Sequence, residues 1–239
     1  MSLLTLLTDP SEGAAVLCGL PNPTTIVGSS DPNVPILLRL ANQEGKELSR
    51  RHDWQVLLVD YTVPALGAEL QTALPSDFDR FTADVEIWNR STNQRYVGPT
   101  DAKTWGRIQG LGITSGAPGW WRLLGNALYI TPAPTAGDTL AFPYQSKYWV
   151  DPVSGSNKEA FTLDTDVSLI PERLLTLGII WRWRSNKGFD YAEAMSTYER
   201  EVERATSRDR GLKVLRPGYG RGDPITDTNW SWPGTITQV

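Results

Sequence analysis

The order of amphipathic segments along the chain constrains its fold more than any other feature. A patterned helix is predicted from Asp31 to His52, and a pair of helices is predicted from Ser168 to about Ser207. Between them, residues 55–150 show the alternation and turn chemistry of short strands. This layout predicts an α+β fold: a helical bundle, formed by an N-terminal helix and a C-terminal helical hairpin, with an inserted antiparallel β-sheet or sandwich.

The first helix opens at Asp31, a capping residue placed before a proline that costs no intrahelical donor there. Its apolar stripe contains Val34, Leu38, Ala41, Gly45 and Leu48. A glycine in the stripe costs about 1 kcal/mol relative to alanine. We therefore expect another backbone to pack closely against Gly45. We expect His52, at the helix end, to be a cap or interface residue rather than a ligand.

The C-terminal pair carries the strongest pattern. Ser168 is the expected cap of its first helix, with Pro171 in the opening turn. This helix carries apolar side chains around nearly its whole circumference, which favours burial of the helix partly against other subunits. Gly188 ends it and Asp190 opens the second helix. The apolar stripe of that second helix contains Tyr191, Met195, Tyr198, Val202 and Ala205.

The middle segment predicts five to seven strands. The clearest hairpin runs from Trp120 to Ile130 around a Gly125-Asn126 turn. The next predicted strand contains Pro143, which requires a sheet edge or a bulge. Residues 101–108 predict one short helical turn.

Composition limits the possible functions. With 239 residues and 40% hydrophobic content, one domain with a large insertion is expected. No long apolar run and no basic leader occurs, so we expect neither membrane insertion nor export. Cys18 and His52 are the single cysteine and histidine, which argues against zinc, haem and histidine-based triads. We therefore expect no cofactor and no metal.

No acidic pair comes with the partners that catalysis needs. Asp164 and Asp166 fall in a predicted loop, and Glu201 and Glu203 fall on a charged helix face. Neither pair accompanies a histidine, a metal motif or a phosphate cradle, so we expect no enzyme.

Charge is distributed unevenly. The chain carries −4, yet five basic side chains against Asp209 and Asp223 give residues 207–223 a charge of +3. With Asp227 counted, residues 1–206 therefore carry −6. Such a tail suits an acidic partner surface or a neighbour in an oligomer, and a solvated terminus is the alternative. Because its two tryptophans lie among Asn, Pro and Gly, the tail is expected to dock as an extended arm.

These patterns divide the chain and name candidate interface residues. The expected parts are an N-terminal extension (1–30), a helix of the core (31–54), the β insertion (55–150), the C-terminal helices (151–210) and a docking arm (211–239). The candidate oligomer or partner interface contains Trp181, Trp183, Arg208, Arg210, Lys213, Arg216, Tyr219, Arg221, Trp230 and Trp232. Trp120 and Trp121 leave open a second class of function, a carbohydrate-binding receptor module.

Four segments resemble one family of virion proteins. They are Leu38–Trp54, the Leu74–Asp79 turn, Tyr129–Pro134 and Gly188–Glu193. The chain resembles head-to-tail adaptor proteins of tailed bacteriophages over about residues 31–208. It is most similar to the tail tubular protein A type of short-tailed phages. A stopper or tail-completion protein of the phage neck is the alternative within the same class.

The resemblance implies a ring of about twelve subunits, a dodecamer attached below the portal protein. Such a ring lines the DNA exit channel, meets a downstream tail or nozzle protein, and passes double-stranded DNA without sequence-specific binding. The family places helices around the channel and the β part outward or toward the next tail component. The implied location is the head-tail neck of the virion, after assembly in the host cytoplasm.

Overall fold

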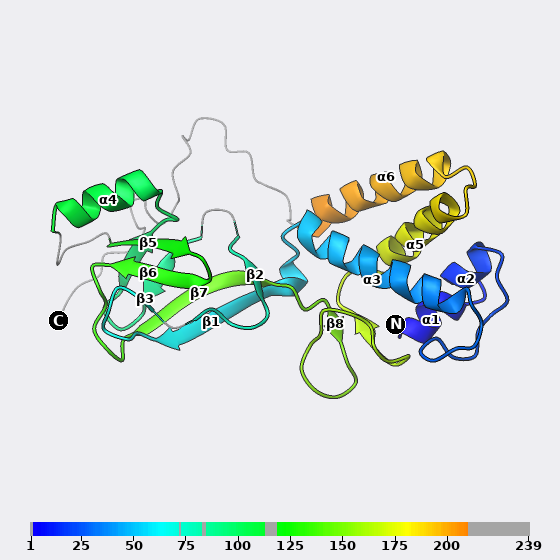
Figure 1. Cartoon of the computed structure of the whole chain (residues 1–239), viewed down its shortest axis with the longest axis horizontal. Coiled ribbons are helices and arrows are strands. Elements are labelled where there is room, and N and C mark those ends of the chain that lie inside the picture. The colour runs from blue at the N-terminus through cyan, green and yellow to red at the C-terminus, as the bar shows by residue number, and fades with distance from the viewer. Residues whose placement is uncertain (1, 72, 83–84, 113–118, 210–239) are drawn as a thin grey trace, which may run out of the picture.

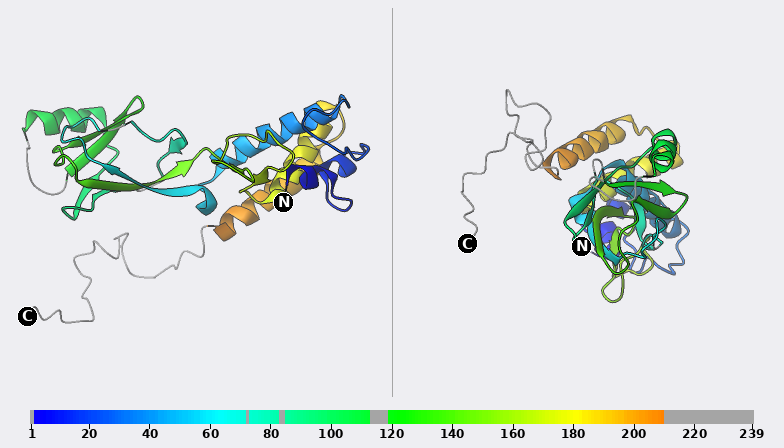
Figure 2. Two further views of the ribbon diagram at one scale, coloured as in Figure 1. Left: turned by 90° about the horizontal axis from the view of Figure 1, so that it is seen from below. Right: turned by 90° about the vertical axis from the view of Figure 1, so that its left-hand side faces the viewer.

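The computed structural model describes residues 2–71, 73–82, 85–112 and 119–209. The molecule is elongated, with a helical block at one end and a β block at the other (Figure 1). Viewed along the long axis, the sheet of the β block is curled (Figure 2). Each block contains its own cluster of buried apolar side chains. The predicted α+β class is therefore confirmed.

The helical block is assembled from both ends of the described chain. Its helices are α1 (Leu3–Thr8), α2 (Ala14–Leu17), α3 (Val34–Arg51), α5 (Glu172–Asn186) and α6 (Ala192–Asp209). Leu3 and Leu7 of α1 and Ala14 and Ala15 of α2 are completely buried in the core that these helices share. Residues 2–30 thus pack into the helical block.

Helix α3 starts later than its sequence suggests. Asp31 Oδ1 accepts the Asn33 N–H at 2.9 Å, in a turn that precedes the helix. Val34 is the first helical residue, and Pro35 rather than Pro32 occupies the first turn. His52 is the C-cap, as expected. Arg50 and Arg51 before it place positive charge in the last turn, where the helix dipole favours it.

Gly45 is closely packed, although its partner is not the expected backbone. A Cβ atom at Gly45 would lie 2.1 Å from Cη2 of Trp149, whose indole is completely buried. The side chain of Trp149 therefore occupies the space that the missing Cβ leaves on α3.

The prediction that Ser168 caps α5 is wrong. Ser168 belongs to β9 (Val167–Ser168), which pairs with β8 (Val150–Asp151), and its hydroxyl donates to the Ile170 carbonyl at 2.9 Å. The N-cap is Pro171, and the helix begins at Glu172. A residue before a proline is disfavoured in the helical region, so Ile170 cannot continue the helix backward.

Helix α5 lies at the centre of the helical block. It contacts α1, α2, α3 and α6, and Leu175 and Ile179 are completely buried among them. Packing within one chain thus accounts for most of the apolar surface of α5. Burial of the rest against other subunits stays a prediction. Lys187 is the C-cap, and Gly188 follows at a φ of 75°, as expected for the end of this helix.

The β block is one curled sheet. A short 3₁₀ turn, η1 (Gln55–Leu57), leads into it. Its strands are β1 (Leu58–Pro64), β2 (Phe78–Arg80), β3 (Ile87–Asn89), β4 (Gln94–Val97), β5 (Gly119–Leu124), β6 (Ala127–Thr131) and β7 (Thr139–Ser146). The strand order is β1-β7-β3-β4-β5-β6, with β2 also paired to β7.

One strand pair departs from the predicted antiparallel sheet. Strands β4 and β5 are parallel, with Tyr96 opposite Gly119, and α4 (Ala102–Gly110) lies in the connection between them. A parallel pair needs such a crossover. The β5–β6 hairpin is confirmed, since Gly125 takes a φ of 62° in its turn.

Pro143 lies in the middle of the sheet. It is opposite Asp60 of β1, whereas on its other side β7 pairs with β3 at residues 140–141 and with β2 at residues 145–146. Pro143 therefore falls where the ladder passes from one partner to the next. The interruption replaces the edge or bulge that the proline was expected to require.

Candidate partner interfaces

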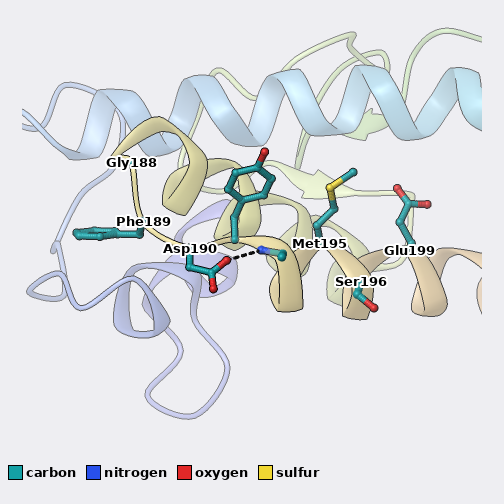
Figure 3. A pocket seen from close by; sticks show the side chains of 8 residues that line it. Gly188, Phe189, Asp190, Met195, Ser196 and Glu199 are labelled. Atoms are coloured by element: carbon teal, nitrogen blue, oxygen red, sulfur yellow. Dashed lines mark hydrogen bonds between the residues drawn. The ribbon is translucent and has the colours of Figure 1, made fainter.

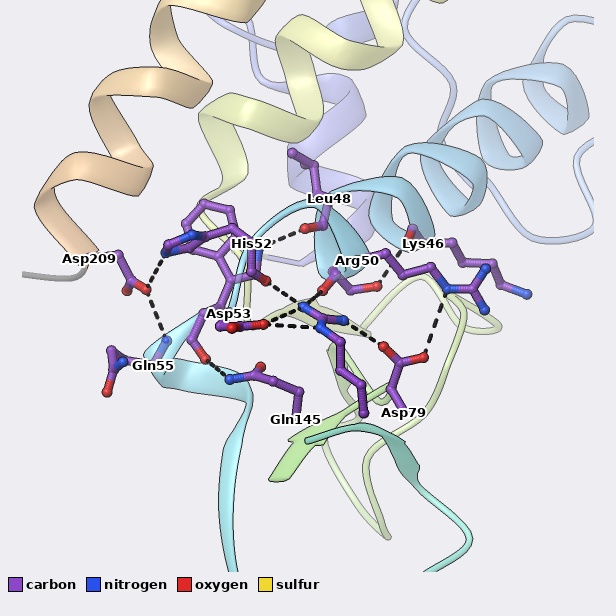
Figure 4. Close-up of polar contacts among 12 residues, drawn as sticks. Lys46, Leu48, Arg50, His52, Asp53, Gln55, Asp79, Gln145 and Asp209 are labelled. Carbon is purple, nitrogen blue, oxygen red and sulfur yellow. Dashed lines mark hydrogen bonds and ion pairs between the residues drawn. The ribbon is translucent and has the colours of Figure 1, made fainter. Parts of the chain in front are cut away.

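Arg80 of β2 joins the two blocks through polar contacts at their junction, where His52, Asp53 and Asp79 lie close together (Figure 4). Its guanidinium donates to Asp53 at 3.0 Å, to Asp79 at 2.6 Å, and to the carbonyls of Ser49 and His52 at 3.2 and 2.9 Å. The two carbonyls belong to the C-terminal end of α3, where a cation is favoured by the helix dipole. One planar side chain thus fixes β2 of the β block against the C-terminal end of α3.

Asp209, the last described residue of α6, reaches the same junction. Its Oδ2 lies 3.2 Å from Nε2 of His52 and accepts the backbone N–H of Gln55 at 3.0 Å. His52 is buried and packs edge-on against Trp54, with ring centroids 4.9 Å apart. The C-terminal end of α6 is therefore held between the two blocks.

Three helices of the helical block meet at a buried ion pair. Glu44 of α3 is completely buried, and its Oε2 accepts from Nε of Arg182 on α5 at 2.5 Å. Burial, together with the Glu44 carboxylate, raises the pKa of Tyr198 on α6. A buried pair of this kind stabilises little in total, but it strongly penalises removal of either partner.

The carboxylates of Asp164 and Asp166, the acidic pair of the loop before α5, bind other parts of the chain. Asp164 accepts the N–H groups of Ile26 and Val27 at 3.1 and 2.8 Å, which attaches residues 2–30 to the loop before α5. Asp166 binds the ammonium of Lys158 at 2.8 Å. Both carboxylates are thus used to hold segments of the helical block together.

The environment of Asp166 also shifts its titration. Burial raises the pKa of this carboxyl, but the Lys158 ammonium and the amides of Thr162 and Leu163 outweigh burial and lower the pKa below its usual range. Within the described ranges, no group of three or more histidine, cysteine and acidic side chains is arranged to hold a metal.

A hollow opens at the α5–α6 turn (Figure 3). We call it the turn hollow; it is lined by Gly188, Phe189, Asp190, Tyr191, Ala192, Met195, Ser196 and Glu199. Phe189, Tyr191 and Met195 are 62%, 41% and 39% exposed, which is high for such large apolar side chains. The turn lies at the end of the helical block away from the β block (Figure 1). An exposed apolar group of this kind is typical of an interaction surface.

The sequence does not predict the turn hollow, because helical periodicity shows which face of a helix is apolar but not where along its length that face is covered by other helices. Tyr191 and Met195 belong to the predicted apolar stripe of α6, yet Tyr198 and Val202 are the buried members. Phe189 lies in the turn, outside either stripe. Three large apolar residues within seven positions of Gly188 are the signal that could have indicated it.

The predicted interface residues fall in different places. Trp183 is 3% exposed in the core of the helical block, and Trp181 is half-buried against Tyr191, with ring centroids 6.4 Å apart. Arg208 is exposed on the outer face of α6, beside Arg204. The other predicted residues, which are Arg210, Lys213, Arg216, Tyr219, Arg221, Trp230 and Trp232, lie outside the described residues, as does the predicted arm.

The adjacent tryptophans of β5 do not form one platform. Neighbouring residues of a strand point to opposite faces of a sheet. Trp121 is completely buried in the β core, whereas Trp120 is half-buried on the opposite face. A sugar-stacking surface made by both rings is therefore ruled out by the geometry.

Comparison with known families gives one finding that covers most of the chain. The model of the family described as SU10 adaptor protein matches residues 11–222. This range includes α2 to α6, both blocks and their junction. No curated protein gives a match. In the part of the chain that the structure describes, none of the helices combines the length and apolarity needed to cross a membrane.

Proposed function

The chain belongs to the SU10 adaptor protein family, and on that premise we propose that it is a structural protein of the phage virion that joins the portal to the tail. The observation that carries this proposal is the family match over residues 11–222, which includes both blocks. The chain acts by binding other neck proteins and performs no catalysis. Its place is the head-tail neck, after assembly in the host cytoplasm.

In this proposal the subunits form a closed ring of about twelve copies, as in adaptors of the tail tubular protein A type of short-tailed phages. One side of the ring meets the portal and the other meets the downstream tail or nozzle protein. The junction at Arg80 supports this role, because it holds β2 against the end of α3, so that every copy presents its two blocks in the same arrangement.

The ring lines the channel through which DNA leaves the head. The charge of −6 on residues 1–206 supports this proposal, since cationic contacts to phosphate would add salt-dependent affinity and slow the passage of DNA. Double-stranded DNA therefore passes without sequence-specific binding.

The test is to mix the purified chain with the portal protein encoded in the same genome and to measure the mass of the complex. A discrete assembly with one copy of the chain per portal subunit supports the adaptor function. If the chain binds a preformed portal–adaptor complex but not the portal itself, it is a stopper or tail-completion protein instead. A chain that binds neither contradicts both.

A further inference from the structure

We propose that the turn hollow binds the C-terminal segment around Trp230 and Trp232 of a neighbouring copy of the chain. This inference rests on the proposed ring, and it names the surface and the segment through which adjacent subunits hold one another.

The exposed side chains of the turn hollow are suited to an aromatic ligand. Phe189, Tyr191 and Met195 expose two rings and a thioether to solvent, and Figure 3 shows Phe189 and Met195 at the turn hollow. Aromatic rings and methionine sulfur both pack favourably against an indole. The C-terminal segment carries two tryptophans within three residues, followed by Pro233. Tryptophan is among the residues that most often supply the central contacts of an interface.

The wall of the turn hollow is already ordered in the single chain. Tyr191 packs against Trp181 with ring centroids 6.4 Å apart, and Trp181 packs against the buried Tyr198 at 6.1 Å. This row of rings connects the surface to the core of the helical block. A preformed wall lowers the cost of ordering side chains when a ligand binds.

Charge favours the same pairing. Asp190 lines the turn hollow, and Glu193 lies in the first turn of α6 beside it. Residues 210–239 carry Arg210, Lys213, Arg216 and Arg221 against Asp223 and Asp227, a net charge of +2. Asp190 and Glu193 thus place negative charge beside an apolar hollow, which favours encounter with a basic segment that carries two tryptophans.

The segment has the length to reach an adjacent subunit. It begins beside Asp209, which His52 and Gln55 hold at the junction, and the turn hollow lies at the other end of α6, ~27 Å away for 18 residues. Residues 210–229 can span up to ~65 Å in extended form. The segment is therefore more than twice as long as α6, so its reach is not limited to its own copy.

A neighbouring copy, rather than the same copy, fits the needs of a closed ring. A ring is built from a heterologous interface, in which each subunit offers two different surfaces. One segment and one turn hollow per subunit satisfy each other around the ring with none left over. Because each subunit both gives a segment to one neighbour and receives one from the other, this contact links every adjacent pair in the ring.

The direct test places a photo-crosslinking amino acid at Trp230 of the full-length chain. The labelled chain is mixed with an isotope-labelled copy, with and without the portal, and the adducts are mapped by mass spectrometry. We expect adducts to residues 188–199 of the other copy. Adducts to residues 188–199 of the same copy, to the portal alone or to any other surface would overturn the proposal. Portal binding is measured in the same samples, so failure of the adaptor function is seen separately.

A complementation experiment tests the pairing without a crosslinker. Phe189→Ala with Tyr191→Ala removes the turn hollow, and Trp230→Ala with Trp232→Ala removes the segment. Each double variant should weaken self-association by roughly tenfold or more. Mixing the two should restore part of it, because one intact hollow and one intact segment then meet. The control is Leu111→Ser, a residue 67% exposed on the β block, which should leave association unchanged. No loss in either double variant, or a loss without recovery on mixing, would overturn the proposal.

Discussion

At the scale of single residues, glycines and a buried ion pair set the spacing of the helices. Gly45 makes room for Trp149, and a Cβ atom at Gly178 of α5 would lie 2.3 Å from the carboxyl carbon of Glu44. The helices can approach this closely because the missing side chains leave space for an indole and a carboxylate. Substitutions at these positions test that reading.

Gly45→Ala should destabilise the chain by about 2 kcal/mol, because overpacking against a buried indole outweighs the gain in helix propensity. The measurement is urea unfolding followed by circular dichroism. Gly106→Ala on α4 is the matched control, since among the described residues no atom outside the local backbone of α4 lies within 4 Å of its added Cβ. The control substitution should leave the free energy of unfolding unchanged or raise it by up to about 1 kcal/mol. Equal effects at both positions would contradict the packing argument.

Arg182→Met should cost about 3–5 kcal/mol, because it leaves the carboxylate of Glu44 buried without its cation. The double variant Glu44→Met with Arg182→Met should recover most of that loss, since no charge then remains buried. Unfolding free energies of both single variants and of the double variant complete the cycle. Losses that simply add would show that the pair is not coupled.

Acid should weaken the helical block through Asp166. Its pKa in the folded chain is below the ordinary value, so its ionised form stabilises the fold at neutral pH. That contribution is lost as pH falls through the folded pKa, in the window below about pH 4. Asp166→Asn should therefore show a flatter dependence of melting temperature on pH between about 5 and 2. An unchanged slope would show that Asp166 is not responsible.

At the scale of elements, the junction decides how helices and sheet are placed. Arg80→Met should leave both blocks folded but widen the range of angles between them, because the contacts to the end of α3 are lost. Spin labels at Gln43 and Lys103, in a Cys18→Ala background, report the distance distribution between blocks. Arg95→Met, which removes a pair with Glu86 within the β block, is the control and should leave the distribution narrow. A narrow distribution in both variants would show that the junction does not depend on Arg80.

Local patterns predicted the elements better than their partners. The hairpin around Gly125 and the end of α5 at Gly188 depend on glycine turn chemistry within a few residues, and both are confirmed. The parallel pairing of β4 with β5 and the indole against Gly45 join residues that are distant in sequence. No local pattern contains such contacts, so these parts could not be predicted.

The candidate site was predicted less well than the fold. Trp181 is one of the predicted interface residues, but helical periodicity does not show that its ring packs behind Tyr191 of the turn hollow. Most of the other predicted interface residues lie outside the described residues, and their role stays a prediction.

At the scale of the whole molecule, an elongated subunit with two cores and a fixed junction is suited to a repeated assembly. Its family membership and its acidic blocks support a neck ring that surrounds DNA without gripping it.

The central claim is tested most directly by a cryo-electron microscopy reconstruction of the chain bound to its portal. The account predicts a closed ring below the portal, with one copy per portal subunit and the DNA channel running through it. A chain bound outside the channel, or an open assembly without rotational symmetry, would contradict the account.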